Sequence, residues 1–545
     1  PGDIDRFRFR AEKGQKLAIE TRARGLIPYL ADAVPGWFQA VVALYDDTGN
    51  EVAFADDYRF EPDPVMFYDI PKDGEYELEI RDSIYRGRED FVYRVVISER
   101  PFITRMFPLG GVEGERCDVS VAGWNLSETS LSLDTRAGGQ RSREIRYSRG
   151  GVVSNSVPYA VGVMPEISES ENNDTIERAA KVNLPTVING RIEKAGDVDV
   201  FGFSGKARDP VVLEIDARRL HSPLDALVRL TDAFGTVIAW NDDWVLKDEQ
   251  HLHKDVAGLL THHADPYLSV VLPRDGIYFA HVLDTRGHGG PAHAYRLRIS
   301  EPMPDFALRV TPSSISLRAG SIVPIEVHAL RKDGYEGPIE VAVKDPDLGF
   351  SISGATIPPG SNRLRMTLTA PARAPDGPVA LELEGRAEVH GRTIVRPVVP
   401  AEDKMQAFLY RHLVPSRELF VEVQKSKWRM PAIQLAARTP VRIVAGQTAL
   451  VRIKTGRANT LRELQLELQN PPTGVSLHDV ALIPGGLAFR LSAERDAVQG
   501  SFADNLIVEA YREFTPKAQP GKPPPPKRRS SMGVLPAIPV EVVMQ

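Results

Sequence analysis

The chain has 545 residues with 67 basic and 73 acidic side chains, which gives a net charge of −6 at pH 7. This length exceeds what one hydrophobic core supports, so several domains are expected. The small negative charge argues against nucleic acid as a partner, and no uncharged apolar run is long enough to predict a membrane span. A single cysteine, Cys117, excludes an intrachain disulfide and a zinc site of several thiolates. The 43 glycines and 43 prolines favour turn-rich β architecture.

The first segment of the chain is repeated further along. Gly2–Phe9 matches Gly196–Phe203, and more identities follow in the same order. The later identities include Asp63, Pro64, Tyr76, Asp82, Tyr93 and Arg94, which match Asp265, Pro266, Tyr278, Asp284, Tyr295 and Arg296. So many ordered identities predict a duplicated domain, over residues 1–99 (the first repeat) and 166–301 (the second repeat).

Both repeats carry the pattern of β-strands. Asp5–Phe9, Glu75–Ile80 and Tyr295–Ile299 alternate charged or polar residues with apolar ones, which is the period of a half-buried antiparallel strand. Lys72–Gly74 and Arg274–Gly276 are turn sequences that supply a glycine for positive φ. Each repeat is therefore predicted to be a β-sandwich.

The residues of the second repeat resemble a known family, the bacterial pre-peptidase C-terminal (PPC) domain. The segments that carry the resemblance are Glu169–Thr175, Asn189–Ile192, Gly196–Phe201, Asn241–Asp243 and Pro273–Tyr278. The resemblance implies a jelly-roll-like β-sandwich of the kind found in secreted bacterial proteins. The first repeat matches less completely, because it lacks the acidic leader and the first strand.

This difference leads to an expectation about the first repeat. A strand equivalent to residues near Val187 to Ile192 is missing, which leaves unpaired backbone groups at a sheet edge. We expect the first repeat to be the less stable copy, or to be completed by chain outside this sequence. The opening at Pro1 is interpreted as that of a processed or truncated piece.

Three further domains are predicted around the repeats. Residues 100–165 resemble a small immunoglobulin-like domain of the IPT/TIG type, through Pro108–Gly111 and Val119–Leu126. Short strands separated by turns predict an immunoglobulin-like sandwich over residues 302–429, with a short connector, and a second one over 430–545. The whole chain is thus predicted to be all-β, a string of β-sandwich domains. Met405, Phe408, Leu409 and Leu413 stand near helical spacing, so Ala401–Leu413 is predicted to be a short helix.

A basic, proline-rich segment lies near the C-terminus. Gln519–Ser531 contains five prolines and is predicted not to join a sheet ladder, whereas Val534–Val543 has the pattern of a strand. Two interpretations remain open for this segment. It is either a flexible loop between the last two strands or a docking segment for an acidic partner.

The sequence contains no recognisable catalytic motif. It has no His-Glu-x-x-His, no Gly-x-Ser-x-Gly, no phosphate-binding glycine loop and no Cys-x-x-Cys, so we expect a protein that is not an enzyme. Histidines gather in the second repeat, where imidazoles could hold zinc or copper or could simply be surface groups. They are His221, His251, His253, His262, His263, His281, His288 and His293.

Oxygen-bearing side chains gather in two short segments of the second repeat. Ca²⁺ takes six to eight oxygen ligands, and the resemblance to collagen-binding members of the PPC family implies an acidic leader that binds calcium. The predicted metal ligands are Glu169, Glu171, Asn173, Asp174, Asp197 and Asp199. The alternative is that Asn173–Thr175 caps a turn and that Asp197 and Asp199 hold a tight loop.

These observations lead to three hypotheses about function. The first is a non-catalytic, extracytoplasmic bacterial protein (periplasmic, cell-surface or secreted) that serves in binding, adhesion or spacing within a larger assembly. The second is an accessory region of a secreted hydrolase. The third is a module that binds a polysaccharide or a matrix protein. The sequence does not identify the partner, because sandwich faces are generic scaffolds and function lies in variable loops.

Overall fold

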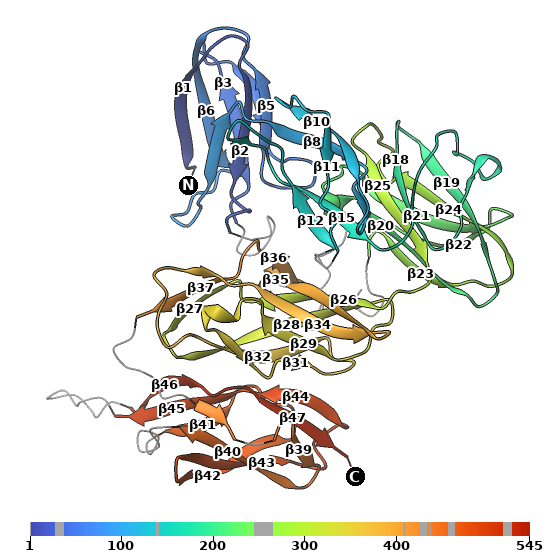
Figure 1. Cartoon of the computed structure of the whole chain (residues 1–545). Coiled ribbons are helices and arrows are strands. Elements are labelled where there is room, and N and C mark those ends of the chain that lie inside the picture. Colours follow the sequence, from blue (N-terminus) through green and yellow to red (C-terminus); the bar gives the residue numbers. More distant parts are fainter. Residues whose placement is uncertain are drawn as a thin grey trace. The chain divides into compact units, whose positions relative to one another are not determined.

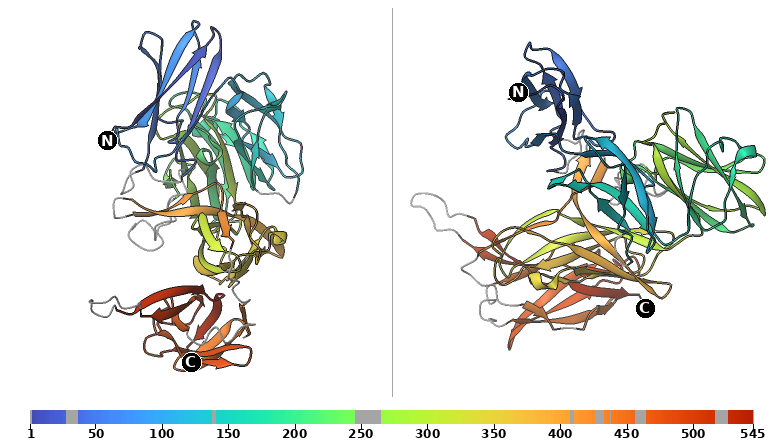
Figure 2. Two further views of the ribbon diagram at one scale, coloured as in Figure 1. Left: turned by 90° about the vertical axis from the view of Figure 1, so that its left-hand side faces the viewer. Right: turned by 45° about the horizontal axis from the view of Figure 1, so that its top comes forward.

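The computed structural model describes residues 2–27, 37–137, 141–244, 265–406, 410–425, 433–436, 438–455, 464–515 and 526–544. Within these ranges the chain forms strands and three short 3₁₀ helices, and it has no α-helix (Figures 1 and 2). The strands form pairs of sheets around separate hydrophobic clusters. The prediction of an all-β string of β-sandwich domains is confirmed.

The chain divides into two compact units. The first comprises residues 1–303 with 403–414, and the second comprises residues 304–402 with 415–545. Over the described ranges, no helix is long and apolar enough to cross a membrane.

The first repeat is a sandwich of two antiparallel sheets. One sheet has the order β1 (Ile4–Ala11), β6 (Gly74–Asp82), β3 (Ala40–Tyr45), β4 (Glu51–Ala55), and the other has the order β5 (Val65–Asp69), β2 (Lys16–Arg22), β7 (Arg94–Ser98). The alternation in Glu75–Ile80 predicted that one side of this strand is buried, and this is confirmed: Tyr76, Leu78 and Ile80 all lie in the core between the sheets.

The second repeat has the same strand order with three additional strands. One sheet has the order β16 (Glu166–Ser168), β18 (Thr186–Arg191), β25 (Ala294–Ser300), β20 (Pro210–Asp216), β23 (Tyr267–Val271). The other has the order β17 (Ala180–Lys181), β19 (Val198–Gly205), β24 (Gly276–Asp284), β21 (Ala226–Asp232), β22 (Val237–Asn241). Strands β16, β17 and β18 have no counterpart among the described strands of the first repeat, where β1 and β7 are sheet edges.

Carboxylates that are identical between the repeats hold equivalent turns. Asp63 accepts hydrogen bonds from the backbone N–H groups of residues 23–25, and Asp265 accepts them from those of residues 217–219. Asp82 and Asp284 likewise accept from backbone N–H groups of the turns that follow them. Much of the sequence identity between the repeats is therefore explained by turn geometry.

Strand β25 departs from the predicted half-buried pattern. All seven of its residues are buried, including Arg296 and Arg298 at 4% and 5% exposure. Arg296 donates to Glu166 and Asn189, and Arg298 donates to Glu214. The charged face of this strand can be buried because the carboxylates of Glu166 and Glu214 pair with the two guanidinium groups. The alternation of charged and apolar residues therefore did not predict which residues are exposed to solvent.

The segment between the repeats forms small sheets around a core that includes Val119, Val121 and Tyr159. Its strands are β8 (Phe102–Phe107), β9 (Gly110–Val112), β10 (Asp118–Trp124), β11 (Ser130–Ser132), β12 (Ser142–Ile145), β13 (Ser148–Arg149), β14 (Val152–Val153) and β15 (Val157–Gly162). Strands β9 and β15 pair in parallel.

The second unit begins with a large sheet packed on a small one. The large sheet has the order β30 (Ser351–Ser353), β32 (Arg363–Thr369), β28 (Ile322–Lys332), β26 (Asp305–Thr311), β35 (Arg392–Gln406), β34 (Leu383–Val389), β29 (Ile339–Val343), β31 (Thr356–Ile357). Strand β36 (Tyr410–Pro415) pairs with β35, and residues 403–414 of these two strands belong to the first unit. The small sheet is β27 (Ser314–Arg318), β37 (Phe420–Gln424), β33 (Val379–Ala380).

The C-terminal part of this unit has three sheets. Their orders are β38 (Ile433–Leu435), β40 (Thr448–Thr455), β43 (Gly486–Ala493), β42 (Val475–Ile483); β39 (Val441–Val444), β47 (Ile538–Val543), β44 (Phe502–Leu506); and β41 (Gln465–Leu468), β45 (Val508–Phe514), β46 (Arg528–Val534). The predicted strand near residues 534–543 corresponds to β47.

Two local predictions were wrong. The segment Ala401–Leu413 is not a helix, because its described residues belong to β35 and β36, which pair with each other. The end of the basic, proline-rich segment does join a ladder, because residues 528–531 lie in β46 and pair with β45. Pro526, the last proline of the segment, precedes this strand. Within the strand, the guanidinium group of Arg529 lies 3.6 Å from the centroid of the Tyr511 ring. Residues 519–525 of the segment lie outside the described residues.

Candidate metal centre

The acidic leader of the second repeat crosses from one sheet of the sandwich to the other. It begins in β16, which runs parallel to β18, and ends in β17, which runs parallel to β19. The backbone of Asn173 accepts a hydrogen bond from the N–H of Val200 at 3.0 Å, and the N–H of Glu169 donates to Asn189 at 2.9 Å. Asn172 has a φ of 71°, which turns the chain between these contacts. The leader is thus attached to both sheets.

An inner group of side chains meets where the leader covers the end of the sandwich. Glu169 accepts from the Arg191 N–H at 2.8 Å and from the Asn173 amide at 3.3 Å. Asp199 accepts from the Tyr295 hydroxyl at 2.7 Å. Gly190 makes this approach possible, because a Cβ there would lie 2.4 Å from both Glu169 Oε2 and Tyr295 Oη.

Three oxygens at this place are buried and lack a hydrogen-bond donor among the described residues. They are Asn173 Oδ1, Asp197 Oδ1 and Asp199 Oδ1. Their residues are 2%, 3% and 0% exposed, so water does not reach them freely. Buried oxygens without donors are costly to a fold unless a cation or an ordered water completes them.

The electrostatics of the group reflect an excess of negative charge. Burial, and next the adjoining Glu169 carboxylate, raise the pKa of Asp199 well above its usual range. Burial, followed by Glu169 and Glu193, raises the pKa of Glu171 to about 7. Carboxylates that resist ionisation in this way mark a place where positive charge is missing.

The outer part of the group lies on the turn before β19. Asp197 Oδ2 accepts from the Glu193 N–H at 2.7 Å, which closes the turn at Gly196 (φ 77°). Lys194 Nζ lies 3.7 Å from Asp197 Oδ1 and 3.7 Å from Asp174 Oδ2. Oδ2 of Asp197 therefore holds the loop, as the alternative to a metal site predicts. Oδ1 of the same carboxylate lies near the ammonium group of Lys194.

The structure brings the six predicted ligands to one region, but their placement is not that of a preformed carboxylate cage. No three of the described His, Cys, Asp and Glu side chains form a metal-binding group by themselves. A cation here would depend on the Asn173 amide oxygen as well as on carboxylates, and oxygen of both kinds suits Ca²⁺. Of the residues in the capping alternative, Thr175 gives no side-chain cap to the 3₁₀ helix that follows, η1 (Ile176–Arg178).

Sequence reasoning missed Tyr295, Glu193 and Lys194 as neighbours of the group. Tyr295 could have been found, because it is identical to Tyr93 in the first repeat. Tyr93 donates to Asp5 at 2.6 Å, just as Tyr295 donates to Asp199. The identity of both residues of this tyrosine–aspartate pair in the two repeats could have predicted that Tyr295 contacts Asp199.

The histidines of the second repeat do not form a cluster within the described residues. His281 is buried and bonds Thr231 at 3.0 Å, and burial together with Arg229 lowers its pKa to about 4. His221 ends η2 (Arg218–Leu220), and the N–H of His288 donates to Asp284. Four other histidines of the second repeat, for which a metal role and a surface role were both left open, lie outside the described residues: His251, His253, His262 and His263.

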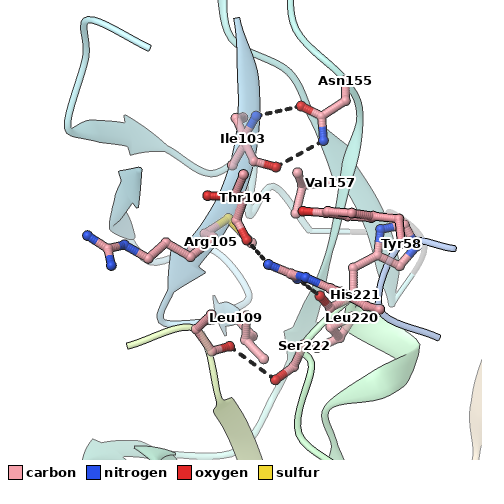
Figure 3. A pocket seen from close by; sticks show the side chains of 13 residues that line it. Tyr58, Ile103, Thr104, Arg105, Leu109, Asn155, Val157, Leu220, His221 and Ser222 are labelled. Carbon is pink, nitrogen blue, oxygen red and sulfur yellow. Dashed lines mark hydrogen bonds between the residues drawn. The ribbon is translucent and has the colours of Figure 1, made fainter. Parts of the chain in front are cut away.

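A separate hollow lies within the first unit, where the repeats meet the segment between them (Figure 3). Asn155 accepts from the N–H of Ile103 and donates to its carbonyl there, at 2.6 and 3.0 Å. Arg59 reaches from the first repeat and donates to the carbonyls of Thr104 and His221. Because the polar groups that line it bond one another, we interpret this hollow as a joint between domains.

Comparisons with known proteins give limited matches. No family model matches the chain. A probable subtilase-type serine protease of Deinococcus radiodurans is 29% identical over 164 residues, which cover 27% of this chain and only 20% of the protease. The pre-peptidase C-terminal domain of a Bacillus anthracis collagenase was found among solved structures, with 14% identity and a TM-score of 0.16, covering 22% of this chain and 94% of that domain.

Proposed function

We propose that this chain is a non-catalytic accessory region of a secreted bacterial protein, and that calcium stabilises its second repeat. The observation that carries the calcium proposal is the set of three buried oxygens without donors beside carboxylates of raised pKa. The accessory role is supported by the partial similarity to a probable subtilase-type serine protease. The fold, a string of β-sandwiches, is compatible with such a role but does not by itself identify it.

The proposed ligands are the oxygens of Glu169, Asn173, Asp197 and Asp199, with Glu171 and Asp174 beside them. Calcium would supply positive charge to the three buried oxygens that receive no hydrogen bond, and it would favour the ionised carboxylates. Because the leader contacts both sheets, the ion would hold this entry segment against the sandwich. It would therefore stabilise the folded second repeat by mass action.

Calorimetric titration of the full chain with calcium tests this proposal. We expect binding heat and a higher melting temperature for the second repeat, and we expect both to be lost in a variant with Asp197→Asn and Asp199→Asn. The matched control carries Asp3→Asn and Asp5→Asn, at the equivalent positions of the first repeat. Absence of heat and of a melting shift in the unaltered chain would contradict the calcium proposal.

A specific surface favours a second function, the binding of a protein or a polysaccharide. In β22 of the second repeat, Trp240 is 58% exposed and Val237 is 49% exposed. Trp240 stands opposite Arg229 on the neighbouring strand. Exposed aromatic and apolar side chains beside a cation are typical of recognition surfaces.

Binding of the full chain to collagen and to insoluble polysaccharides tests this surface. We expect a Trp240→Ala variant to lose at least tenfold in affinity for whichever ligand the unaltered chain binds, since a central aromatic anchor contributes about 2 kcal/mol or more. Phe54→Ala, at an exposed position of the first repeat, is the control. Equal binding by both variants would contradict the assignment.

A further inference from the structure

Lys194 occupies an unusual place in the second repeat. It lies in the turn between β18 and β19, and its ammonium is 3.7 Å from one oxygen each of Asp174 and Asp197. The Asp197 oxygen concerned, Oδ1, is one of the three buried oxygens that lack a hydrogen-bond donor. The lysine therefore reaches the edge of the proposed cation site from the solvent side.

The surrounding charge is strongly negative. Six carboxylates lie in this group: Glu169, Glu171, Asp174, Glu193, Asp197 and Asp199. Within the described part of the chain, Lys194 is the only basic side chain that forms an ion pair with any of them. Arg191 is close in sequence, but its guanidinium lies 4.2 Å from the centroid of the Phe107 ring.

We propose that Lys194 is a built-in counter-cation that competes with calcium for the outer edge of this site and so sets the calcium concentration at which the site fills. This inference rests on the proposed calcium function. A lysine that shares Asp197 with a divalent ion must withdraw when the ion binds, because like charges a few ångströms apart repel. The side chain of Lys194 is 67% exposed, and its flexible stem lets the ammonium move into water.

The inference predicts opposite effects on the two states of the site. Without calcium, loss of the ammonium leaves the carboxylates less compensated, so the second repeat should be less stable. With calcium, the same loss removes a competitor, so affinity should rise. A unit charge beside a divalent ion in a water-like medium corresponds to roughly a tenfold change in dissociation constant.

Titration of the metal-free full chain and its Lys194→Gln variant with calcium chloride tests the inference. We expect about tenfold tighter calcium binding by Lys194→Gln and a lower melting temperature in EDTA. Lys194→Arg keeps the charge and should bind calcium about as weakly as the unaltered chain. Lys206→Gln removes an exposed lysine of the same repeat that has no described ion pair, and it should change neither quantity.

The outcomes separate this inference from the calcium proposal. Calcium binding that is equally tight in the unaltered chain and in Lys194→Gln would overturn the role of Lys194 while leaving the calcium site intact. Calcium binding by both chains that is about tenfold tighter in Lys194→Gln would support both the calcium site and the role of Lys194. Absence of binding in every variant would overturn both.

Discussion

At the scale of single residues, the two copies of one hydrogen bond differ in burial. Tyr295 donates to Asp199, which is fully buried, whereas Tyr93 donates to Asp5, which is exposed. We predict that Tyr295→Phe lowers the free energy of unfolding of the second repeat by about 1–3 kcal/mol, because a buried carboxylate loses its donor. Tyr93→Phe should lower that of the first repeat by about 1 kcal/mol or less. Urea unfolding in EDTA compares them, and equal losses would contradict the argument.

His281 predicts a pH dependence at the same scale. Its pKa of about 4 in the folded protein lies below the ordinary value of about 6.5, so the unfolded chain takes up the proton more readily between these values. Its contribution to stability is complete above pH 6.5 and is lost as the pH falls toward 4, by up to about 3 kcal/mol. The carboxylates also titrate, so the difference between the unaltered chain and His281→Gln isolates this effect. His288→Gln, at an exposed position, should behave like the unaltered chain.

At the scale of elements, the added strands of the second repeat bury core side chains that are more exposed to solvent in the first repeat. Phe7 in β1 is 42% exposed, whereas the matching Phe201 in β19 is fully buried. Leu297 and Ile299 of β25 are likewise fully buried, whereas Val95 and Ile97 of β7 are only partly buried. Strand β18 explains the contrast, because it pairs with β25 and places Ile188 in the core.

This contrast predicts unequal protection of the two repeats. Among the described strands, β1 pairs only with β6, whereas β19 pairs with both β24 and β17. Amide hydrogens of residues 4–11 should therefore exchange faster than those of residues 198–205, because edge strands open more easily. Hydrogen exchange measured by mass spectrometry on the full chain decides this. Equal or greater protection of residues 4–11 would show that the first repeat is closed by other means.

At the scale of the whole molecule, the second unit contains a buried link between its two sandwiches. Asn505 is 2% exposed and donates to the carbonyls of Gly354 and Arg365 at 2.7 and 2.8 Å. The N–H of Ala537 also donates to Thr367 at 2.8 Å. These bonds join segments far apart in the sequence, so we expect the two sandwiches of this unit to unfold together.

An Asn505→Ala variant tests this coupling. Two partly buried carbonyls would lose their donor, which costs about 1–3 kcal/mol in total. We expect the calorimetric transition of the second unit to move to lower temperature and to broaden or split. Asn362→Ala, at an exposed position, is the control. An unchanged transition in Asn505→Ala would show that the link is not needed for cooperative unfolding.

The sequence by itself determined the fold class and the duplication. Alternation and turn residues are local signals, and they located β1, β6, β25 and β47 because the pleat of a strand repeats every two residues. The sequence also pointed to the six oxygen-bearing side chains that lie together in the second repeat, since each belongs to a short polar segment, and their role as calcium ligands stays a prediction. Local spacing failed at Ala401–Leu413, where pairing between β35 and β36 overrides a helical pattern.

Only the tertiary structure decided which buried polar groups have a hydrogen-bond or ion-pair partner. Burial of Arg296 and Arg298, the missing donors of Asn173 and Asp199, and the place of Lys194 all depend on strands that are far apart in the sequence. Pairing of β18 with β25 and of β19 with β24 brings these groups together. The energy of a charge depends on the donors and the solvent around it, and no local pattern in the sequence records that environment.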